Sequence, residues 1–434
     1  MWKTTIVGAG VLLLGAAVAV MPDAAEKEAA GAREKKPRPA KLHRADTKAA
    51  DSEAEWAPAV EPKPLSQNVR RALDWLAEHQ LAGGAWGQGE ESVQMGGGTA
   101  MKDVASVADT CAAALALIRS GSTPSKGPYA KNLLGAVDHV CSEIEKFDED
   151  SLYITATRGT RLQTKLGPYI DTFMASLMLT EVQGEMPNKK GEKRVGRALA
   201  SVLEKMQKHQ RGDGTWSEQG WAATLSQGLA VKAINRAAQK GNRVDEEVRA
   251  KAEGYSRRAF DRKSGKFSAA GSAGVDLYTA GANYGAMADS VNTNAAQETQ
   301  VREIIKNGAS QEEKEEAQQK LARFDAAKRD LDEAARAVIR RLDDKQFIAG
   351  FGSNGGEEFL SYMNIGEALV VKGGDEWKSW DKSITENLNR IQNQDGSWTG
   401  HHCVTGRTFC TSAALLVLMV DRTPVPIAAK IGKR

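Results

Sequence analysis

Residues Gln392 to Met419 read QNQDGSWTGHHCVTGRTFCTSAALLVLM. The stretch begins with the end of one predicted helix, turns at a glycine that is followed by a tryptophan, and enters a strongly apolar second helix. Glycine permits the positive φ angle with which many helices end, and the tryptophan can then fold back over that end. The stretch therefore predicts a helical hairpin, with a loop rich in histidine and cysteine between its two helices.

Five weaker copies of this hairpin precede it along the chain. Two of them share its QxxxGxW pattern, so that the three patterns end at Trp86, Trp216 and Trp398. The second helices align on one polar residue each: Thr110, Thr172, Thr224, Thr279, Asn364 and Thr411. Such a repeat predicts an array of packed hairpins. Because the second helices are the more apolar, we expect them to form an inner ring that the first helices surround.

The three QxxxGxW turns and the six hairpins resemble the squalene cyclase and prenyltransferase repeat superfamily. The resemblance covers residues 65–421 and implies an all-α fold, an α/α toroid with a central cavity. Terpenoid cyclases, protein prenyltransferase β subunits and the thioester domains of complement-like proteins share this fold, so the fold alone does not define the activity. The DxDD motif of polyene cyclases and the GCGEQ motif of thioester domains are both absent. We therefore do not expect either of those two activities.

The segments outside the repeats predict an exported protein. Residues 1–24 contain one early lysine and an apolar run rich in Ala, Gly, Leu and Val, which is typical of a signal peptide or an N-terminal membrane anchor. Residues 25–64 are rich in Ala, Lys, Glu and Pro and predict a disordered linker. We also expect a charged helical insertion at residues 295–340 and a C-terminal tail at residues 422–434. The location would be periplasmic or secreted.

The resemblance implies a zinc site. Protein prenyltransferases bind zinc through an Asp-x-Cys at the start of an inner helix and a later histidine. Here Asp109-Thr110-Cys111 matches Asp-x-Cys, and in a closed toroid the sixth hairpin would return beside the first. His402 and Cys410 of that hairpin could then complete a tetrahedral zinc site with Asp109 and Cys111, and a second cysteine is not part of the family pattern. The histidine lies in a different repeat from that of the family pattern.

A disulfide and unpaired buried cysteines are the two alternative interpretations of the cysteines. In an oxidising compartment, two cysteines that lie close together are expected to pair. The pair would be either Cys403 with Cys410, within the loop, or Cys111 with Cys410, between neighbouring hairpins.

Two aspartates and two basic residues are further candidates for the site. Asp109 and Asp171 each precede an aligned threonine, where an aspartate can stabilise the exposed amides and the dipole of its helix. Two carboxylates on adjacent helices could also act as a general acid and a general base, or bind a cation. Arg407 and His401 lie in or beside the loop of the sixth hairpin and are candidates for binding a ligand, Arg407 an anionic one.

Two functions follow from these patterns. The first is an exported scaffold that binds a small-molecule ligand or a protein partner. The second is a divergent enzyme of the terpenoid cyclase and prenyltransferase class, dependent on zinc if the predicted ligands converge. Nucleic acid is not an expected partner, because 59 basic and 56 acidic residues are dispersed along the chain without a basic stripe.

Overall fold

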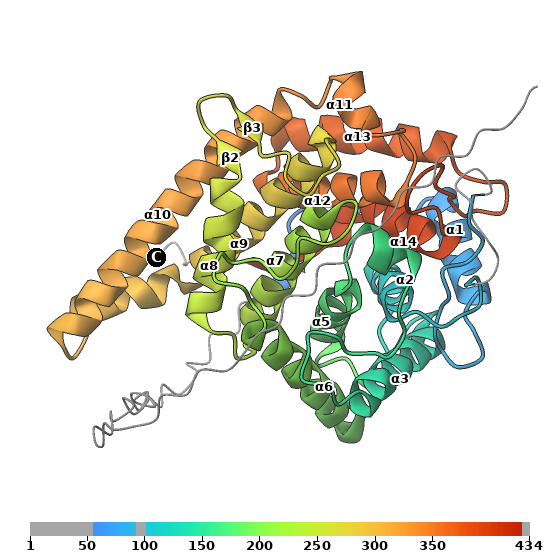
Figure 1. The fold of residues 1–434 in the computed structure, drawn as a ribbon, viewed down its shortest axis with the longest axis horizontal. Coiled ribbons are helices and arrows are strands. Elements are labelled where there is room, and N and C mark those ends of the chain that lie inside the picture. Colours follow the sequence, from blue (N-terminus) through green and yellow to red (C-terminus); the bar gives the residue numbers. More distant parts are fainter. Residues whose placement is uncertain (1–54, 93–100, 428–434) are drawn as a thin grey trace, which may run out of the picture. The chain divides into compact units, whose positions relative to one another are not determined.

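The computed structural model describes residues 55–92 and 101–427, and within these ranges the chain is mostly helical (Figure 1). The helices are α1 (Gln67–Glu78), α2 (Val107–Arg119), α3 (Ala130–Lys146), α4 (Arg161–Lys165), α5 (Ile170–Val182), α6 (Lys189–Lys208), α7 (Ala223–Gln239), α8 (Glu246–Arg258), α9 (Asp276–Asn307), α10 (Gln311–Ile339), α11 (Lys345–Ala349), α12 (Gly356–Lys372), α13 (Gly374–Arg390) and α14 (Arg407–Leu418). The short strands are β1 (Glu55–Pro58), β2 (Phe260–Asp261), β3 (Lys266–Phe267) and β4 (Pro424–Ile427), and a 3₁₀ turn, η2 (Val420–Arg422), precedes β4. The prediction of an all-α fold is confirmed.

Six helices form the buried part of the fold: α2, α5, α7, α9, α12 and α14. Five of them are buried along most of their length, and α9 is buried in its first half. Among these six, α2 packs on α5 and α14, α7 packs on α5 and α9, and α12 packs on α9 and α14. Small residues let their backbones approach closely. A Cβ atom on Gly281 of α9, for example, would lie 2.9 Å from the Cα atom of Ser361 on α12. A cavity of about 30 Å³ remains among α2, α5, α7, α12 and α14.

The other long helices are amphipathic and pack on the buried ones. In α1, for example, the apolar side chains face inward and the charged ones face solvent. The predicted insertion at 295–340 consists of the second half of α9 and of α10, which begins with a capping box between Ser310 and Glu313. α10 packs along α9 and α8, and Asp330 of α10 accepts a hydrogen bond from Arg257 of α8 at 2.6 Å. The charged segment is therefore packed against its neighbours along the chain.

The three QxxxGxW turns make the same contacts. Each tryptophan indole donates to a carbonyl at the end of the preceding helix, as Trp86 does to Leu76 at 2.8 Å. Each glutamine donates to a backbone carbonyl of another first helix, at 2.8 to 2.9 Å: Gln80 to Asn132 of α3, Gln210 to Val248 of α8, and Gln392 to Asn68 of α1. The motif thus caps one helix and joins it to the next hairpin, and the last of these bonds joins the sixth hairpin to the first.

The glycine of each QxxxGxW turn has a positive φ angle. It touches the helix that accepts the hydrogen bond from the glutamine of the same turn. The φ angles of Gly84, Gly214 and Gly396 are 82°, 93° and 95°. A Cβ atom on Gly214 would overlap the carbonyl oxygen of Lys251 on α8. Only glycine combines this backbone conformation with such a close approach.

The described residues of the predicted linker and tail pack against each other and against the folded body. β1 and β4 pair antiparallel, so residues 55–58 of the predicted linker and residues 424–427 of the predicted tail form a small sheet. Trp56 helps to hold it, because the ammonium of Lys240 lies 4.9 Å from the centre of the indole ring.

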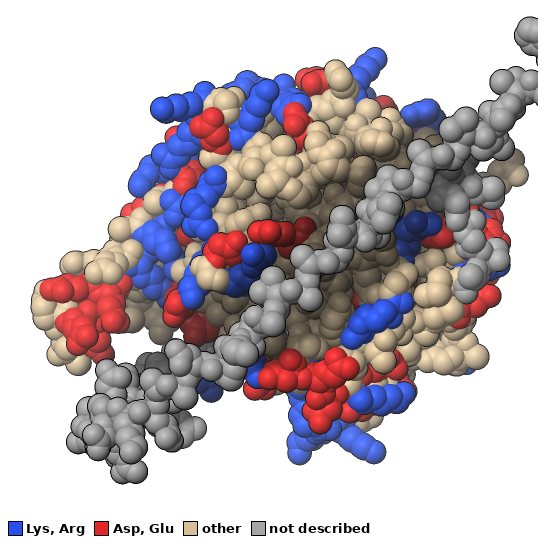
Figure 2. Space-filling view, in the orientation of Figure 1, with Lys and Arg blue, Asp and Glu red and all other residues tan. Residues whose placement is uncertain are grey.

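The predicted signal segment, residues 1–24, lies outside the described residues, as do residues 25–54 of the predicted linker. In the described ranges, no helix combines the length and the apolar character that crossing a bilayer requires. On the face that Figure 2 shows, acidic and basic side chains are interspersed.

Replacing Gly214 by alanine tests the role of the turn glycine. We expect Gly214→Ala to lower the free energy of unfolding by about 2 kcal/mol or more, because a residue with a Cβ atom is strained at positive φ and would also overlap Lys251. Gly212→Ala is the matched control, since a Cβ atom there meets nothing within 4 Å. Urea denaturation of both variants measures the difference, and equal stabilities would contradict this role.

Candidate metal centre

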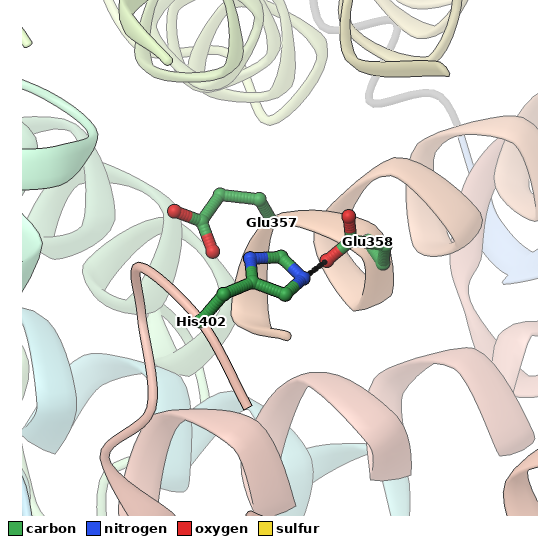
Figure 3. Close-up of side chains that lie close together, drawn as sticks. All are labelled: Glu357, Glu358 and His402. Carbon is green, nitrogen blue, oxygen red and sulfur yellow. Dashed lines mark ion pairs between the residues drawn. The ribbon is translucent and has the colours of Figure 1, made fainter. Parts of the chain in front are cut away.

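Glu357, Glu358 and His402 form a buried cluster (Figure 3). The two glutamates occupy the first turn of α12, and His402 lies in the loop that precedes α14. Figure 3 shows the imidazole ring between the two carboxyl groups. The Nε2 atom of His402 lies 3.1 Å from Oε2 of Glu358, and one ligand atom from each residue can be chosen so that all lie within 4.8 Å of one another. Both glutamates are fully buried and His402 is 6% exposed.

Glycines before α12 make room for these side chains. A Cβ atom on Gly352 would lie 2.6 Å from Cδ2 of His402, and one on Gly355 would lie 2.8 Å from Oε2 of Glu358. The loop that carries His402 turns sharply at the next residue, Cys403, whose φ angle of 51° is uncommon for a residue other than glycine. The local sequence therefore brings two chain segments together around the cluster.

Hydrogen bonds fix one oxygen of each carboxyl group. Tyr278 of α9 donates to Oε1 of Glu358 at 2.7 Å, and the backbone N–H of Phe351 donates to the same atom at 2.9 Å. The backbone N–H of Val404 donates to Oε2 of Glu357 at 3.1 Å. Such bonds to the far side of a carboxylate orient metal ligands in many proteins.

The remaining polar atoms of the cluster have no hydrogen-bond partner. These buried atoms are Oε1 of Glu357, Oε2 of Glu358 and both ring nitrogens of His402. The 3.1 Å contact between His402 and Glu358 is close enough for an ion pair but is not aligned as a hydrogen bond. Buried polar groups without partners destabilise a fold, and native proteins usually satisfy them with another group, a water molecule or an ion.

The protonation of the cluster follows from its burial. Burial and the neighbouring Glu358 raise the pKa of Glu357 to about 7. Burial alone would lower the pKa of His402, but interactions with Cys403 and Glu358 outweigh it and raise this pKa to about 10. At neutral pH a proton on His402 therefore offsets the charge of one carboxylate. A metal ion binding here would displace that proton, because a metal ligand must be the neutral imidazole.

The donor set fits a divalent transition-metal ion. Two carboxylates and one imidazole are ligands that Zn²⁺ accepts, and three protein ligands leave one coordination position for water or another molecule. The cluster could therefore hold a metal ion.

The predicted zinc set does not assemble. In the described part of the chain, one group of three or more His, Cys, Asp or Glu side chains has ligand atoms within 4.8 Å of one another. It consists of Glu357, Glu358 and His402. Asp109, Cys111 and Cys410 therefore do not share a site with His402. Burial raises the pKa of the Cys111 and Cys410 thiols well above the ordinary value, which disfavours the thiolates that bind zinc.

Neither predicted disulfide forms in the structure. The four cysteines all lie in the described ranges, and Cys111, Cys141, Cys403 and Cys410 are buried and free. The thiol of Cys410 instead donates to the carbonyl of Val404 at 3.4 Å.

Asp109 and Asp171 lie at the N-terminal ends of α2 and α5, as expected, and both are buried. Asp171 accepts from the backbone N–H of Ala108 at 2.9 Å and from Gln163 at 2.7 Å. Asp109 accepts from the hydroxyl of Ser106, the N-cap of α2, at 2.6 Å. Asp171 therefore binds an exposed amide of the neighbouring helix α2, and Asp109 is held by the N-cap hydroxyl of its own helix. The other oxygen of Asp109 has no partner, and burial raises the pKa of Asp109 to about 7.

Arg407 and His401, the predicted ligand-binding residues, each have a partner within the protein. Arg407 forms an ion pair with Asp395, and its guanidinium lies 5.1 Å from the centre of the Trp75 ring. His401 is exposed, and its Nε2 atom lies 3.3 Å from the side-chain amide of Asn354. Arg407 therefore stabilises the sixth turn, while His401 remains at the surface.

Glu357 and Glu358 are not among the predicted site residues, because the alignment on Asn364 predicts that the fifth of the second helices begins close to that residue. The predicted register is correct in the first and sixth hairpins, where Trp86 donates to Thr110 and Trp398 donates to Thr411. The fifth buried helix begins at Gly356, so its aligned residue, Asn364, lies well inside the helix. Two glycines followed by two glutamates were a signal for this helix start, because acidic residues are favoured in a first turn.

Comparison with known proteins gives no assignment: no protein-family model and no curated protein matches this chain. Its function is therefore inferred from the geometry of the site.

The raised pKa of Asp109 predicts a pH dependence of stability. The native state holds the Asp109 proton up to a pH of about 7, whereas the unfolded chain releases it near the ordinary aspartate pKa of 3.8. The native state thus binds more protons in this window, and this group lowers stability as the pH rises from about 4 to about 7. Asp109→Asn removes that titration, so we expect the variant to gain stability relative to the wild type across the window.

Urea denaturation at pH 4, 5.5 and 7 measures the difference. We expect the free energy of unfolding of Asp109→Asn to rise relative to that of the wild type by roughly 1.4 kcal/mol per pH unit, between the unfolded and the folded pKa of Asp109. Glu357 and His402 titrate in both proteins and cancel in the comparison. Parallel stability curves would show that Asp109 ionises normally.

Proposed function

We propose that this chain is an α/α toroid that binds a divalent metal ion, Zn²⁺, through Glu357, Glu358 and His402, and that this metal holds a ligand at one mouth of the toroid. The observation that carries the proposal is a buried group in which one ligand atom from each residue lies within 4.8 Å of the others. Four carboxylate and imidazole atoms of this group have no hydrogen-bond partner.

Packing of the buried helices supports the toroid. Each of the six packs on two others, and this series of contacts leads from α2 back to α2. The bond from Gln392 to α1 is consistent with such a closed arrangement. The bond from Ala108 to Asp171 brings the N-terminal ends of α2 and α5 together, as two parallel neighbours require.

The size of the central cavity favours binding at a mouth. A cavity of about 30 Å³ accommodates one or two water molecules, whereas sites for organic ligands usually measure about 300 Å³ or more. The proposed mouth is the end of the toroid where Asp109, Asp171 and Glu357 lie in the first turns of their helices. The role proposed for this mouth is ligand binding.

The export of the chain is a separate proposal, which rests on the sequence of residues 1–24.

A specific observation also favours catalysis as a second function. Three protein ligands are the number that catalytic zinc sites use, because the fourth position then holds a water molecule of lowered pKa. The chain would then be a divergent, zinc-dependent enzyme in which Asp109 is a further buried carboxyl group. Hydrolysis of a chromogenic ester by the zinc-loaded wild type, lost in Glu358→Gln, would favour this second function.

Zinc titration tests the proposal. The full chain, purified without chelator and then stripped with EDTA, is titrated with Zn²⁺ in a calorimeter. We expect one zinc ion per chain, and an affinity at least about 100-fold lower in Glu358→Gln and His402→Ala, because losing a ligand exceeds the 10- to 100-fold effect of losing an outer partner. Cys111→Ser and Cys410→Ser are the matched controls and should bind normally.

Two tyrosine variants test for a smaller change in zinc affinity by the same titration. Tyr278→Phe removes a bond to Glu358 and should weaken zinc binding about 10-fold. Tyr362→Phe removes a bond to the carbonyl of Ile348 and should leave the zinc affinity unchanged. Zinc binding that survives Glu358→Gln but is lost in Cys111→Ser would move the site to the cysteines.

A further inference from the structure

Two exposed aromatic residues lie beside the proposed metal ligands. Phe351 is 55% exposed and Trp221 is 43% exposed. The ring centre of Phe351 lies 5.0 Å from that of His402 and 6.3 Å from that of Trp221, and both pairs meet edge to face. Three rings therefore form a series that leads from solvent to a proposed zinc ligand. Exposed apolar groups next to buried polar ones are typical of binding sites.

The backbone of Phe351 is tied to the metal ligands. Its N–H donates to Glu358, and the preceding residue, Gly350, has a φ angle of 59°. A Cβ atom on Gly350 would lie 2.7 Å from Oε1 of Glu358, so the chain passes directly over this carboxyl group. The position of the Phe351 ring is thus coupled to the geometry of the cluster.

Backbone contacts on both sides hold Trp221 in place. The preceding residue, Gly220, has a φ angle of 122°, and a Cβ atom there would lie 2.9 Å from backbone atoms of Leu166 and Gly167. The following residue, Ala222, donates its N–H to the carbonyl of Lys165 at 2.8 Å. An exposed ring on a fixed backbone loses little conformational entropy when it binds a ligand.

Beside Phe351 there is room for a ligand. A surface pocket of about 480 Å³ is lined by Gly350, Phe351, Leu277, Arg341 and other residues around the start of α9. Pockets of this size accommodate small organic molecules. Phe351 lines this pocket and also contacts His402, so a molecule in the pocket would lie beside the ring that contacts a proposed metal ligand.

We infer that the ligand of this site carries an aromatic ring next to an oxygen donor, as an aryl carboxylate does. The oxygen would bind the metal, and the ring would pack against Phe351, which Trp221 contacts edge to face. Aromatic pairs favour this edge-to-face or offset arrangement. The inference rests on the proposed function, because it requires a metal ion at Glu357, Glu358 and His402.

Two hydroxamates with the same zinc-binding group test the inference. Benzohydroxamate and acetohydroxamate differ in whether they carry a ring, and each is titrated into the zinc-loaded full chain. We expect benzohydroxamate to bind about 10-fold more tightly or better. In Phe351→Ala this advantage should disappear while acetohydroxamate binds as before, because the N–H bond to Glu358 comes from the backbone. Phe351→Leu keeps an apolar side chain and tests whether the ring itself is needed.

Trp221→Ala should also reduce the preference for benzohydroxamate over acetohydroxamate. Val371→Ala removes another exposed apolar group at the far end of α12 and should change nothing. If the zinc-loaded wild type binds both hydroxamates equally, or if Phe351→Ala keeps the preference, the inference is wrong and the metal proposal stands. If the chain binds no zinc, both proposals are overturned.

Discussion

The bond between each QxxxGxW turn and the first helix of another hairpin is the interaction on which the rest of the structure depends. The tryptophan completes one helix end, the glutamine donates to the neighbouring helix, and the glycine lets the two backbones touch. These contacts set the spacing between hairpins, and so they also set where the N-terminal ends of the buried helices meet. Asp171 shows the result, because it lies in the first turn of α5 and accepts from the first turn of α2.

Helix N-terminal ends explain how this protein can bury several carboxyl groups close together. Exposed amides and the helix dipole stabilise acidic side chains in a first turn, which offsets part of the cost of burial. The offset is incomplete at Glu357, Glu358 and Asp109, since each keeps an oxygen without a partner. Such residual destabilisation is typical of functional sites, where stability is given up for binding. A divalent ion between Glu357 and Glu358 would supply the missing partner.

Much of the fold was predictable from the sequence, because the QxxxGxW turns and the apolar second helices repeat along the chain. The candidate site was less predictable. Glu357 and Glu358 lie in the first turn of α12, about two turns before Asn364, so the alignment on Asn364 does not include them in the predicted helix. The pairing of Trp56 with the C-terminal strand joins residues about 370 positions apart, a contact that no local pattern predicts. The cysteines were also hard to interpret, because all four are buried and free, and composition alone cannot distinguish a cysteine that packs in the core from one that binds a metal.

X-ray absorption at the zinc edge tests the central claim most directly, because it identifies the atoms that surround the metal in the loaded full chain. Ligation by Glu357, Glu358 and His402 predicts only nitrogen and oxygen neighbours, at about 2.0 to 2.2 Å, with the outer-shell scattering of a single imidazole. A sulfur neighbour at about 2.3 Å would contradict this account. It would place the metal on Cys111 of α2, Cys410 of α14 or Cys403 of the loop before α14.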